Sequence, residues 1–117
     1  MRSSENIIWT IDGRIRDKAG YTRAMQTLTE ASYQEEGTLQ HQWTIAEDGE
    51  TIHVYECYRD ADAAMKHLET WAKYGSLFTD ATEITRFVVY SELTDELKAA
   101  VAGLNPVYMK PYGGFSK

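Results

Sequence analysis

The sequence predicts an α+β fold of the ferredoxin-like type, a four-stranded antiparallel sheet with two helices on one face. The main observation is the order of the expected elements, β-α-β-β-α-β, followed by a short helix and an extended tail. A second is the hydrophobic period, which switches between two and about 3.6 along the chain. The 117 residues are expected to form a single domain, residues 1–117, because a chain of this length builds one core.

Composition excludes several functional classes. The net charge is −6 with scattered basic residues, so no basic stripe offers a nucleic-acid surface. No segment approaches the roughly 20 apolar residues of a membrane span, and the N-terminus lacks the pattern of a secretory signal. The single cysteine, Cys57, excludes an intrachain disulfide. We therefore expect a cytoplasmic protein that binds neither nucleic acid nor membrane.

The first expected strand covers residues 6–15. Ile7, Trp9 and Ile11 share one face, whereas Ile8 and Thr10 share the other. Apolar side chains on both faces indicate that both are covered. Glycine at position 13 predicts a bulge or the end of the strand.

Residues 19–36 have the period of a helix with one apolar stripe. The stripe consists of Tyr21, Ala24, Met25, Leu28, Ala31 and Ser32. Gly37 follows directly and is expected to stop the helix as a left-handed cap.

Residues 39–58 form an expected hairpin. Leu39, His41, Trp43 and Ile45 alternate with polar residues, and the extended pattern resumes at position 51. The Asp48-Gly49 pair between the two runs is a strong hairpin signal. The acidic tip is expected to be a solvated turn.

A second helix is expected after Asp60 or Asp62, either of which can cap it. Gly75 is expected to end or bend this helix, and Leu77 and Phe78 to add a short apolar turn. The expected buried stripe consists of Ala64, Met65, Leu68, Trp71 and Ala72.

Residues 81–93 read as the fourth strand. Ile84, Arg86, Val88 and Tyr90 are expected on one face, and Thr85, Phe87 and Val89 on the other. Thr94 caps a short third helix that ends before Pro106. The aromatic tail that follows is expected to pack against the protein.

The two helices cover only one face of this sheet. Trp9, Trp43, Tyr55 and Phe87 do not all fit on that face, so the opposite face needs another cover. A second copy of the sheet provides it, and we expect a homodimer closed face to face.

With these elements in place, residues 35–68 resemble the antibiotic biosynthesis monooxygenase (ABM) family. The shared features are a Glu-Pro-Gly-like turn at Glu35-Glu36-Gly37, a hairpin, a strand ending in Tyr-Glu-Cys-Tyr, an acidic cap and an Ala-x-x-x-His-Leu helix. Residues 85–115 are also similar to the C-terminal part of an ABM-like group.

This resemblance implies a dimeric α/β-barrel that oxygenates aromatic or quinone-like metabolites without a cofactor. In that chemistry a base forms the substrate anion, which then reacts with dioxygen. Haem degradation is not expected, because Gly13, His67 and Leu77 stand where haem-degrading members carry asparagine, tryptophan and histidine.

His67 is the expected catalytic base, because it matches the family's histidine and titrates near neutral pH. On its helix it lies at the flank of the apolar stripe, and the alternative is a half-exposed surface histidine. Glu56 matches the family's strand-end glutamate and could orient His67 or pair with Arg86. Arg86 could hold a substrate carboxylate or phenolate.

Aromatic residues supply the other expected substrate contacts, with plain core packing as the alternative. These are Trp43, Trp71 and Tyr74, with Tyr21 and Phe78 beside them. His41 and His53 lie on the hairpin and lack partners at metal-ligand spacing, so no metal is expected. Cys57 is expected to be a buried, inert thiol.

The sequence thus supports two functions. The first is a cofactor-independent monooxygenase, or a related small-molecule enzyme, that acts on a small aromatic or quinone-like metabolite. The second is a non-catalytic dimeric protein of the same fold that binds a ligand or regulates. A large cavity beside His67 would favour the first, and a space filled by Trp71 and Tyr74 would favour the second.

Overall fold

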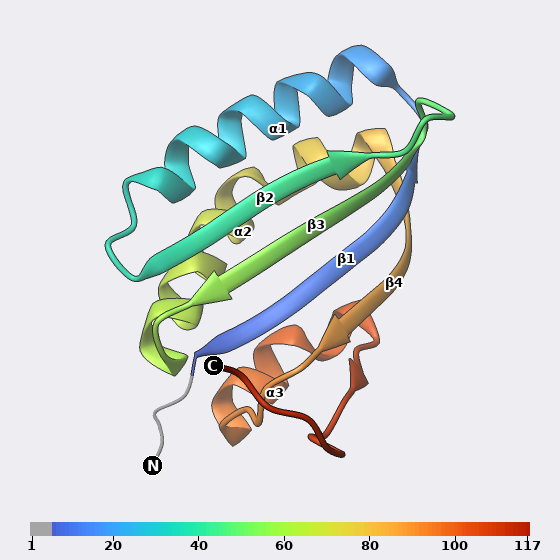
Figure 1. The fold of residues 1–117 in the computed structure, drawn as a ribbon. Coiled ribbons are helices and arrows are strands. Elements are labelled where there is room, and N and C mark those ends of the chain that lie inside the picture. Colours follow the sequence, from blue (N-terminus) through green and yellow to red (C-terminus); the bar gives the residue numbers. More distant parts are fainter. Residues whose placement is uncertain (1–5) are drawn as a thin grey trace.

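A computed structural model describes residues 6–117. Its elements follow the predicted order and add a fifth strand (Figure 1). They are β1 (Ile7–Ile15), α1 (Lys18–Tyr33), β2 (Thr38–Ile45), β3 (Thr51–Tyr58), α2 (Ala61–Ala81), β4 (Thr82–Val89), α3 (Asp95–Val101), the 3₁₀ turn η1 (Ala102–Leu104) and β5 (Val107–Tyr108). The predicted ferredoxin-like α+β architecture is confirmed.

The sheet has the strand order β2-β3-β1-β4-β5. The first four strands are antiparallel, as predicted, whereas β5 runs parallel to β4 and makes the sheet mixed. In Figure 1, α2 lies behind the sheet, and α1 lies beyond the β2 edge and packs against α2. The core lies between the helices and the sheet. We call the strand surface that faces the helices the inner face and the opposite surface the outer face.

A bulge at Gly13 changes which side chains of β4 reach the core. Asp12 pairs with Arg86, but Gly13 pairs with Ile84, so Thr85 is left over. A Cβ at position 13 would lie 2.5 Å from the carbonyl oxygen of Glu83, so glycine allows the strands to approach. The extra residue places Ile84 and Phe87 on the same inner face, and their predicted placement on opposite faces was wrong.

The end of α1 also differs from the prediction. The helix stops at Tyr33, and Gly37 lies beyond it without a positive φ. Its role is close packing, because a Cβ at Gly37 would lie 2.4 Å from the Cβ of Ala63 at the start of α2. The left-handed cap at Gly37 was therefore wrong, and the glycine instead lets the loop approach α2.

α2 is longer than predicted and turns a different stripe inward. Asp60 is its N-cap, as one of the two expected residues, and the helix continues through Gly75, Leu77 and Phe78. The buried residues of this helix are Ala63, Ala64, His67, Gly75, Phe78 and Ala81. Gly75 lies inside this helix and serves packing, because a Cβ there would lie 2.7 Å from the ring of Trp71. No helix within residues 6–117 is long and apolar enough to cross a membrane.

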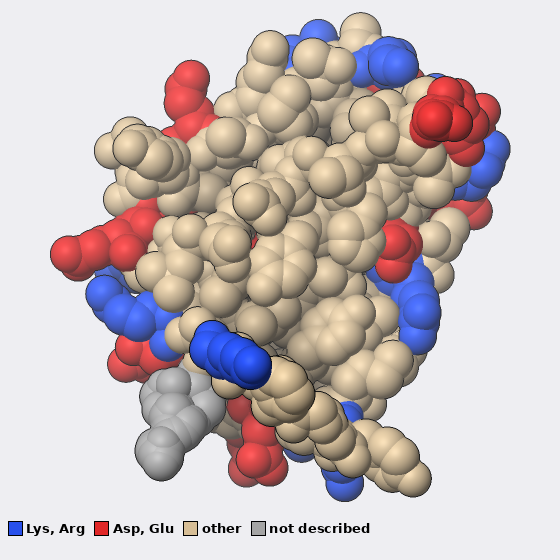
Figure 2. Space-filling view, in the orientation of Figure 1, with Lys and Arg blue, Asp and Glu red and all other residues tan. Residues whose placement is uncertain are grey.

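The outer face of the sheet carries few charges at its middle, and charged side chains gather at its rim (Figure 2). Strand alternation places Ile8, Thr10 and Tyr55 on this face, away from the helices. Thr94 caps α3, as predicted. The tail then pairs with the sheet through β5 and through Met109, whose N–H donates to the carbonyl oxygen of Val89. Tyr112 and Phe115 are exposed in the single chain, so the expected packing of this part of the tail stays a prediction.

Candidate functional site

Glu56 is a buried carboxylate on the inner face of β3. Tyr58, two residues further on the same face, and Trp9, its neighbour on β1, both donate hydrogen bonds to Glu56 Oε1. The indole bond measures 2.8 Å from Trp9 Nε1. A buried charge is costly unless such donors surround it, so two inward-facing residues of the sheet, Trp9 and Tyr58, together hold this carboxylate.

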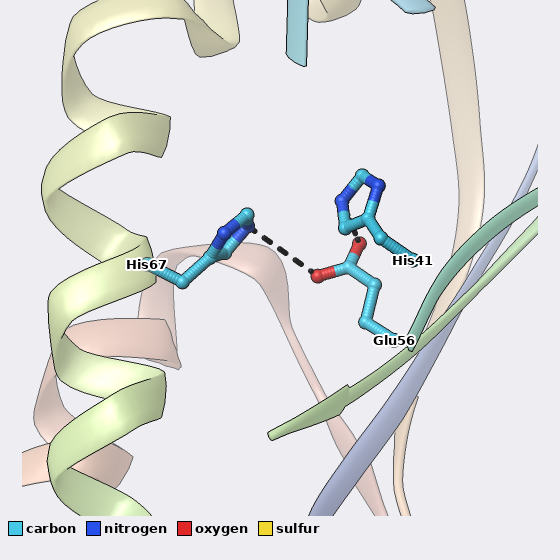
Figure 3. A group of neighbouring side chains, drawn as sticks. All are labelled: His41, Glu56 and His67. Carbon is cyan, nitrogen blue, oxygen red and sulfur yellow. Dashed lines mark ion pairs between the residues drawn. The ribbon is translucent and has the colours of Figure 1, made fainter. Parts of the chain in front are cut away.

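His67 lies opposite Glu56, on the inward stripe of α2 (Figure 3). Its Nε2 is 3.6 Å from Glu56 Oε1, and only 3 % of the residue is exposed. The predicted placement at the half-exposed flank of the helix was wrong. The prediction centred the buried stripe on apolar residues such as Leu68 and Ala72. In the structure the polar residue His67 occupies the centre of the stripe, and Leu68 and Ala72 lie beside it.

The other nitrogen of His67 contacts a second carboxylate, Glu35, in the loop between α1 and β2. His67 Nδ1 is 3.0 Å from Glu35 Oε1. Thr38 donates to the same oxygen at 2.6 Å, and Thr70 on α2 donates to Oε2. The imidazole of His67 is thus held between two carboxylates that come from different elements.

These contacts change the pKa values in opposite directions. Burial alone would raise the pKa of Glu35, but the hydrogen bonds that it accepts outweigh burial and lower it. Burial alone would lower the pKa of His67, but the bond to Glu35 and the charges of Glu56 and Glu35 outweigh burial and raise it. Glu35 is therefore an ionised acceptor, and His67 Nδ1 must be the donor.

His41 on β2 completes the group shown in Figure 3. Its Nε2 lies 3.8 Å from Glu56 Oε2, and Trp43 donates from Nε1 to His41 Nδ1 at 3.0 Å. Burial lowers the pKa of His41, which favours the neutral ring. Because an indole nitrogen only donates, the proton of neutral His41 must be on Nε2, facing Glu56.

Two small cavities adjoin this cluster. One, of about 20 Å³, is lined by His67, Glu56 and the apolar side chains Trp9, Ile11, Leu68, Trp71, Phe87, Val101 and Leu104. The other, of about 10 Å³, adjoins His41 and Trp43. The larger one has room for about one water molecule. His67 therefore faces a small, mainly apolar space and not a cavity of several hundred Å³.

The ligand atoms of His41, Glu56 and His67 lie within 4.8 Å of one another, and these residue types suit a divalent transition metal. A histidine that binds metal through Nε2 donates from Nδ1 to a neighbouring group. His67 meets this requirement through Glu35. His41 does not, because Trp43 donates to its Nδ1. The hydrogen bonds thus fit an acid–base cluster better than a metal site.

The other residues predicted for the site are placed differently. Trp43 and Trp71 line the cavities, but Tyr74 packs at the edge of the core without lining either one. Arg86 is exposed and lies beside Asp12 on the outer face of the sheet. It therefore does not pair with Glu56, which is on the inner face. His53 bonds Asp12 at 2.7 Å, also away from His67.

Cys57, between Glu56 and Tyr58, points to the opposite side of β3 and is buried. Burial raises the pKa of its thiol, which agrees with the expected lack of reactivity.

Sequence reasoning missed Glu35 as a site residue and left His41 undecided. Glu35 and His67 are 32 residues apart and meet only through packing of α1, α2 and the intervening loop. A signal was present, because Glu35 begins the turn that resembles the family's Glu-Pro-Gly. His41 shares the alternation of Trp43, which would have placed both on the inner face.

Comparison with known families gives a match over most of the chain. The sequence model described as "Antibiotic biosynthesis monooxygenase" matches residues 11–102. This range includes Glu35, His41, Glu56 and His67. A search of curated proteins found no match.

Solved structures share the fold at low sequence identity. MupZ from Pseudomonas fluorescens has a TM-score of 0.82 at 21 % identity, with 97 % of this chain and 96 % of that chain covered. SnoaB from Streptomyces nogalater, a cofactor-independent oxygenase, has a TM-score of 0.66 at 8 % identity, with 78 % and 96 % covered. A conserved protein from Methanosarcina mazei Go1 has a TM-score of 0.63 at 16 % identity, with 74 % and 92 % covered.

Proposed function

Because the chain belongs to the antibiotic biosynthesis monooxygenase family, we propose that it is a cofactor-independent monooxygenase, or a related small-molecule enzyme, with His67 as its base. The observation that carries this proposal is the fixed orientation of His67. Glu35 holds Nδ1, and Nε2 is left toward Glu56 and the aromatic cavity. A base within reach of a bound hydroxyl is the requirement for forming a substrate anion.

The lining of the site suggests the class of substrate. Trp9, Trp71 and Phe87 present aromatic surfaces, which suit a flat aromatic or quinone-like ring. No lysine or arginine lines the two cavities among the described residues, whereas carboxylates flank His67 on both sides. We infer a neutral substrate with a weakly acidic hydroxyl, because a carboxylate substrate would be repelled by this site. Arg86 is no longer proposed as a substrate contact.

A ring-sized substrate requires more space than this cavity of about 20 Å³ provides. Trp71 on α2 and Leu104 in η1 form part of its wall, so a displacement of Trp71 or of the α3–η1 segment would enlarge it. Replacement of Leu104 by alanine is the direct way to create this space. The variant is expected to bind ring-sized ligands more tightly than the wild type if the segment closes the site.

The small cavity also favours the second function, a dimeric protein that binds a ligand without catalysis. Tryptophan fluorescence and oxygen uptake separate the two, with a panel of hydroquinones and anthrones as ligands. Enzyme-dependent oxygen uptake with a panel member supports the monooxygenase. Quenching of tryptophan fluorescence without oxygen uptake or substrate conversion supports the binding protein. If neither quenching nor uptake is seen, hydroquinones and anthrones are excluded as ligands.

We also infer that the functional unit is a homodimer that buries the outer face. The middle of that face is poor in charge (Figure 2). The exposed tail residues Tyr112 and Phe115 offer further apolar area for a second copy. Apolar surface of this kind is stabilised when another chain covers it.

A further inference from the structure

Glu35 stands between the buried site and solvent. On one side its Oε1 accepts the hydrogen bond from His67 Nδ1. On the other side it lines a surface groove of about 380 Å³, together with Gln34, Glu36, Gly37, Arg59, Asp62, Ala63 and Lys66. The side chain of Glu35 is 11 % exposed, against 4 % for that of His67. Glu35 therefore links His67 to water in the groove.

The other polar neighbours of His67 lead inward. Glu56 and Tyr58 come from β3, and His41 comes from β2. Ser32 on α1, whose buried Oγ lies 3.5 Å from His67 Nδ1, is a fourth polar neighbour. None of these four residues lines the groove. Glu56 is enclosed by Trp9 and Tyr58, and the cavity beside it has room for about one water molecule. A proton taken up by His67 thus has one hydrogen-bonded neighbour on the path to the groove.

We infer that Glu35 is the proton-exit residue of the site, which takes the proton from His67 Nδ1 and releases it to water in the groove. This inference rests on the proposed role of His67 as base. It adds a positioning role as well, because the same hydrogen bond fixes the ring with Nε2 toward the cavity.

Each step of this transfer moves a proton and no electrons. The substrate O–H bond breaks as an N–H bond forms at His67 Nε2. The N–H bond at Nδ1 then breaks as an O–H bond forms at Glu35, which afterwards loses its proton to water. The net result is one proton transferred from substrate to solvent, with neutral His67 restored in its other tautomer. The starting tautomer is restored when Glu35 passes a proton from water back to Nδ1 and Nε2 gives its own proton to the product in the cavity.

The hydrogen bonds from Thr38 and Thr70 set how readily Glu35 accepts this proton. Both hydroxyls donate to the carboxylate and favour its ionised form. Loss of one of them makes the carboxylate more basic, so transfer from His67 becomes less unfavourable. Thr70 therefore offers a variant whose expected effect on proton exchange is opposite to that of removing the carboxylate.

Proton exchange between His67 Hδ1 and water, measured by NMR on histidine-labelled protein, tests the inference without a substrate. Glu35→Gln keeps an oxygen that accepts from Nδ1 but cannot take the proton, and the Thr70 hydroxyl can turn to accept from its amide. We expect the Nδ1–H tautomer to persist and exchange to slow by about tenfold or more. Exchange at the wild-type rate in folded Glu35→Gln would overturn the inference.

Two further variants complete the test. Glu36→Gln removes a carboxylate from the same groove without touching His67, and it is expected to exchange like the wild type. Equal slowing in Glu36→Gln would show a general effect of groove charge and overturn the specific role of Glu35. Thr70→Val is expected to speed exchange severalfold, so an unchanged or slower rate counts against the inference even if Glu35→Gln does not fold. Because no substrate is used, these results stand apart from any failure to find oxygenase activity.

Discussion

At the scale of single residues, the buried imidazole of His67 derives its properties from carboxylates on both sides. Glu35 contacts Nδ1 and Glu56 lies near Nε2, so the protonated ring is stabilised despite its burial. The pairing of His67 with Glu56 was predictable, because both match positions of one family motif. The contact with Glu35 was not, because only the approach of the loop to α2 creates it.

The opposite pKa shifts of this pair predict how stability depends on pH. The raised pKa of His67 stabilises the fold below its ordinary value of 6.5, and this stabilisation is lost as the pH rises through the folded-state pKa. The lowered pKa of Glu35 stabilises the fold above its ordinary value of 4.5, and this is lost as the pH falls through the folded-state pKa. The pair therefore contributes most between pH 4.5 and 6.5.

Urea unfolding of the wild type and Glu35→Gln measures this contribution. The difference in free energy of unfolding is expected to be greatest at about pH 5.5, in the middle of this window, and smaller at about pH 4 and about pH 8. The charge of Glu35 also raises the pKa of His41, so loss of Glu35 changes the titration of His41 in the same direction as that of His67. A difference that stays constant across this pH range would show that Glu35 and His67 do not form the ion pair.

At the scale of elements, the hydrophobic pattern located all four main strands and both long helices, but it did not locate the close contacts between them. The sequence pattern predicted Gly37 as a helix cap. In the structure a glycine is required there because Ala63 of α2 leaves no room for a Cβ. The bulge opposite Gly13 likewise depends on pairing with β4, so the face of Ile84 was not readable from alternation alone.

The contact between Gly37 and Ala63 predicts a compensating pair of substitutions. Gly37→Ala is expected to cost about 1–3 kcal/mol of stability, because the added methyl group overpacks the loop against α2. Ala63→Gly in the same chain removes the opposing methyl group and is expected to recover part of that loss. Urea unfolding of both single variants and the double variant gives the coupling free energy. Additive effects of the two changes would contradict the proposed contact.

At the scale of the whole molecule, the two faces of the sheet have different environments. The helices cover the inner face, whereas the outer face presents a surface with few charges and a tail with exposed aromatic rings (Figure 2). The sequence indicated this asymmetry through apolar residues on both faces of β1. The homodimer stays a prediction, because its interface depends on a second chain.

Light scattering tests the homodimer. We expect about twice the chain mass of 13.4 kDa at micromolar concentration, and a mass of 13.4 kDa would contradict the prediction. Tyr55→Glu places a charge on the outer face and is expected to shift the protein toward the monomer. Gln26→Glu adds the same charge on the exposed side of α1 and is expected to leave the mass unchanged.

The turnover of His67→Ala on a confirmed substrate tests the central claim most directly. Because His67 is buried between Glu35 and Glu56, the variant is also expected to lose stability, so turnover is measured well below its unfolding midpoint. Glu69→Ala, on the exposed side of the same helix, is the matched control. The account predicts a loss of roughly two to four orders of magnitude for His67→Ala and near wild-type turnover for the control. Unchanged turnover in folded His67→Ala would contradict the assignment of His67 as the base.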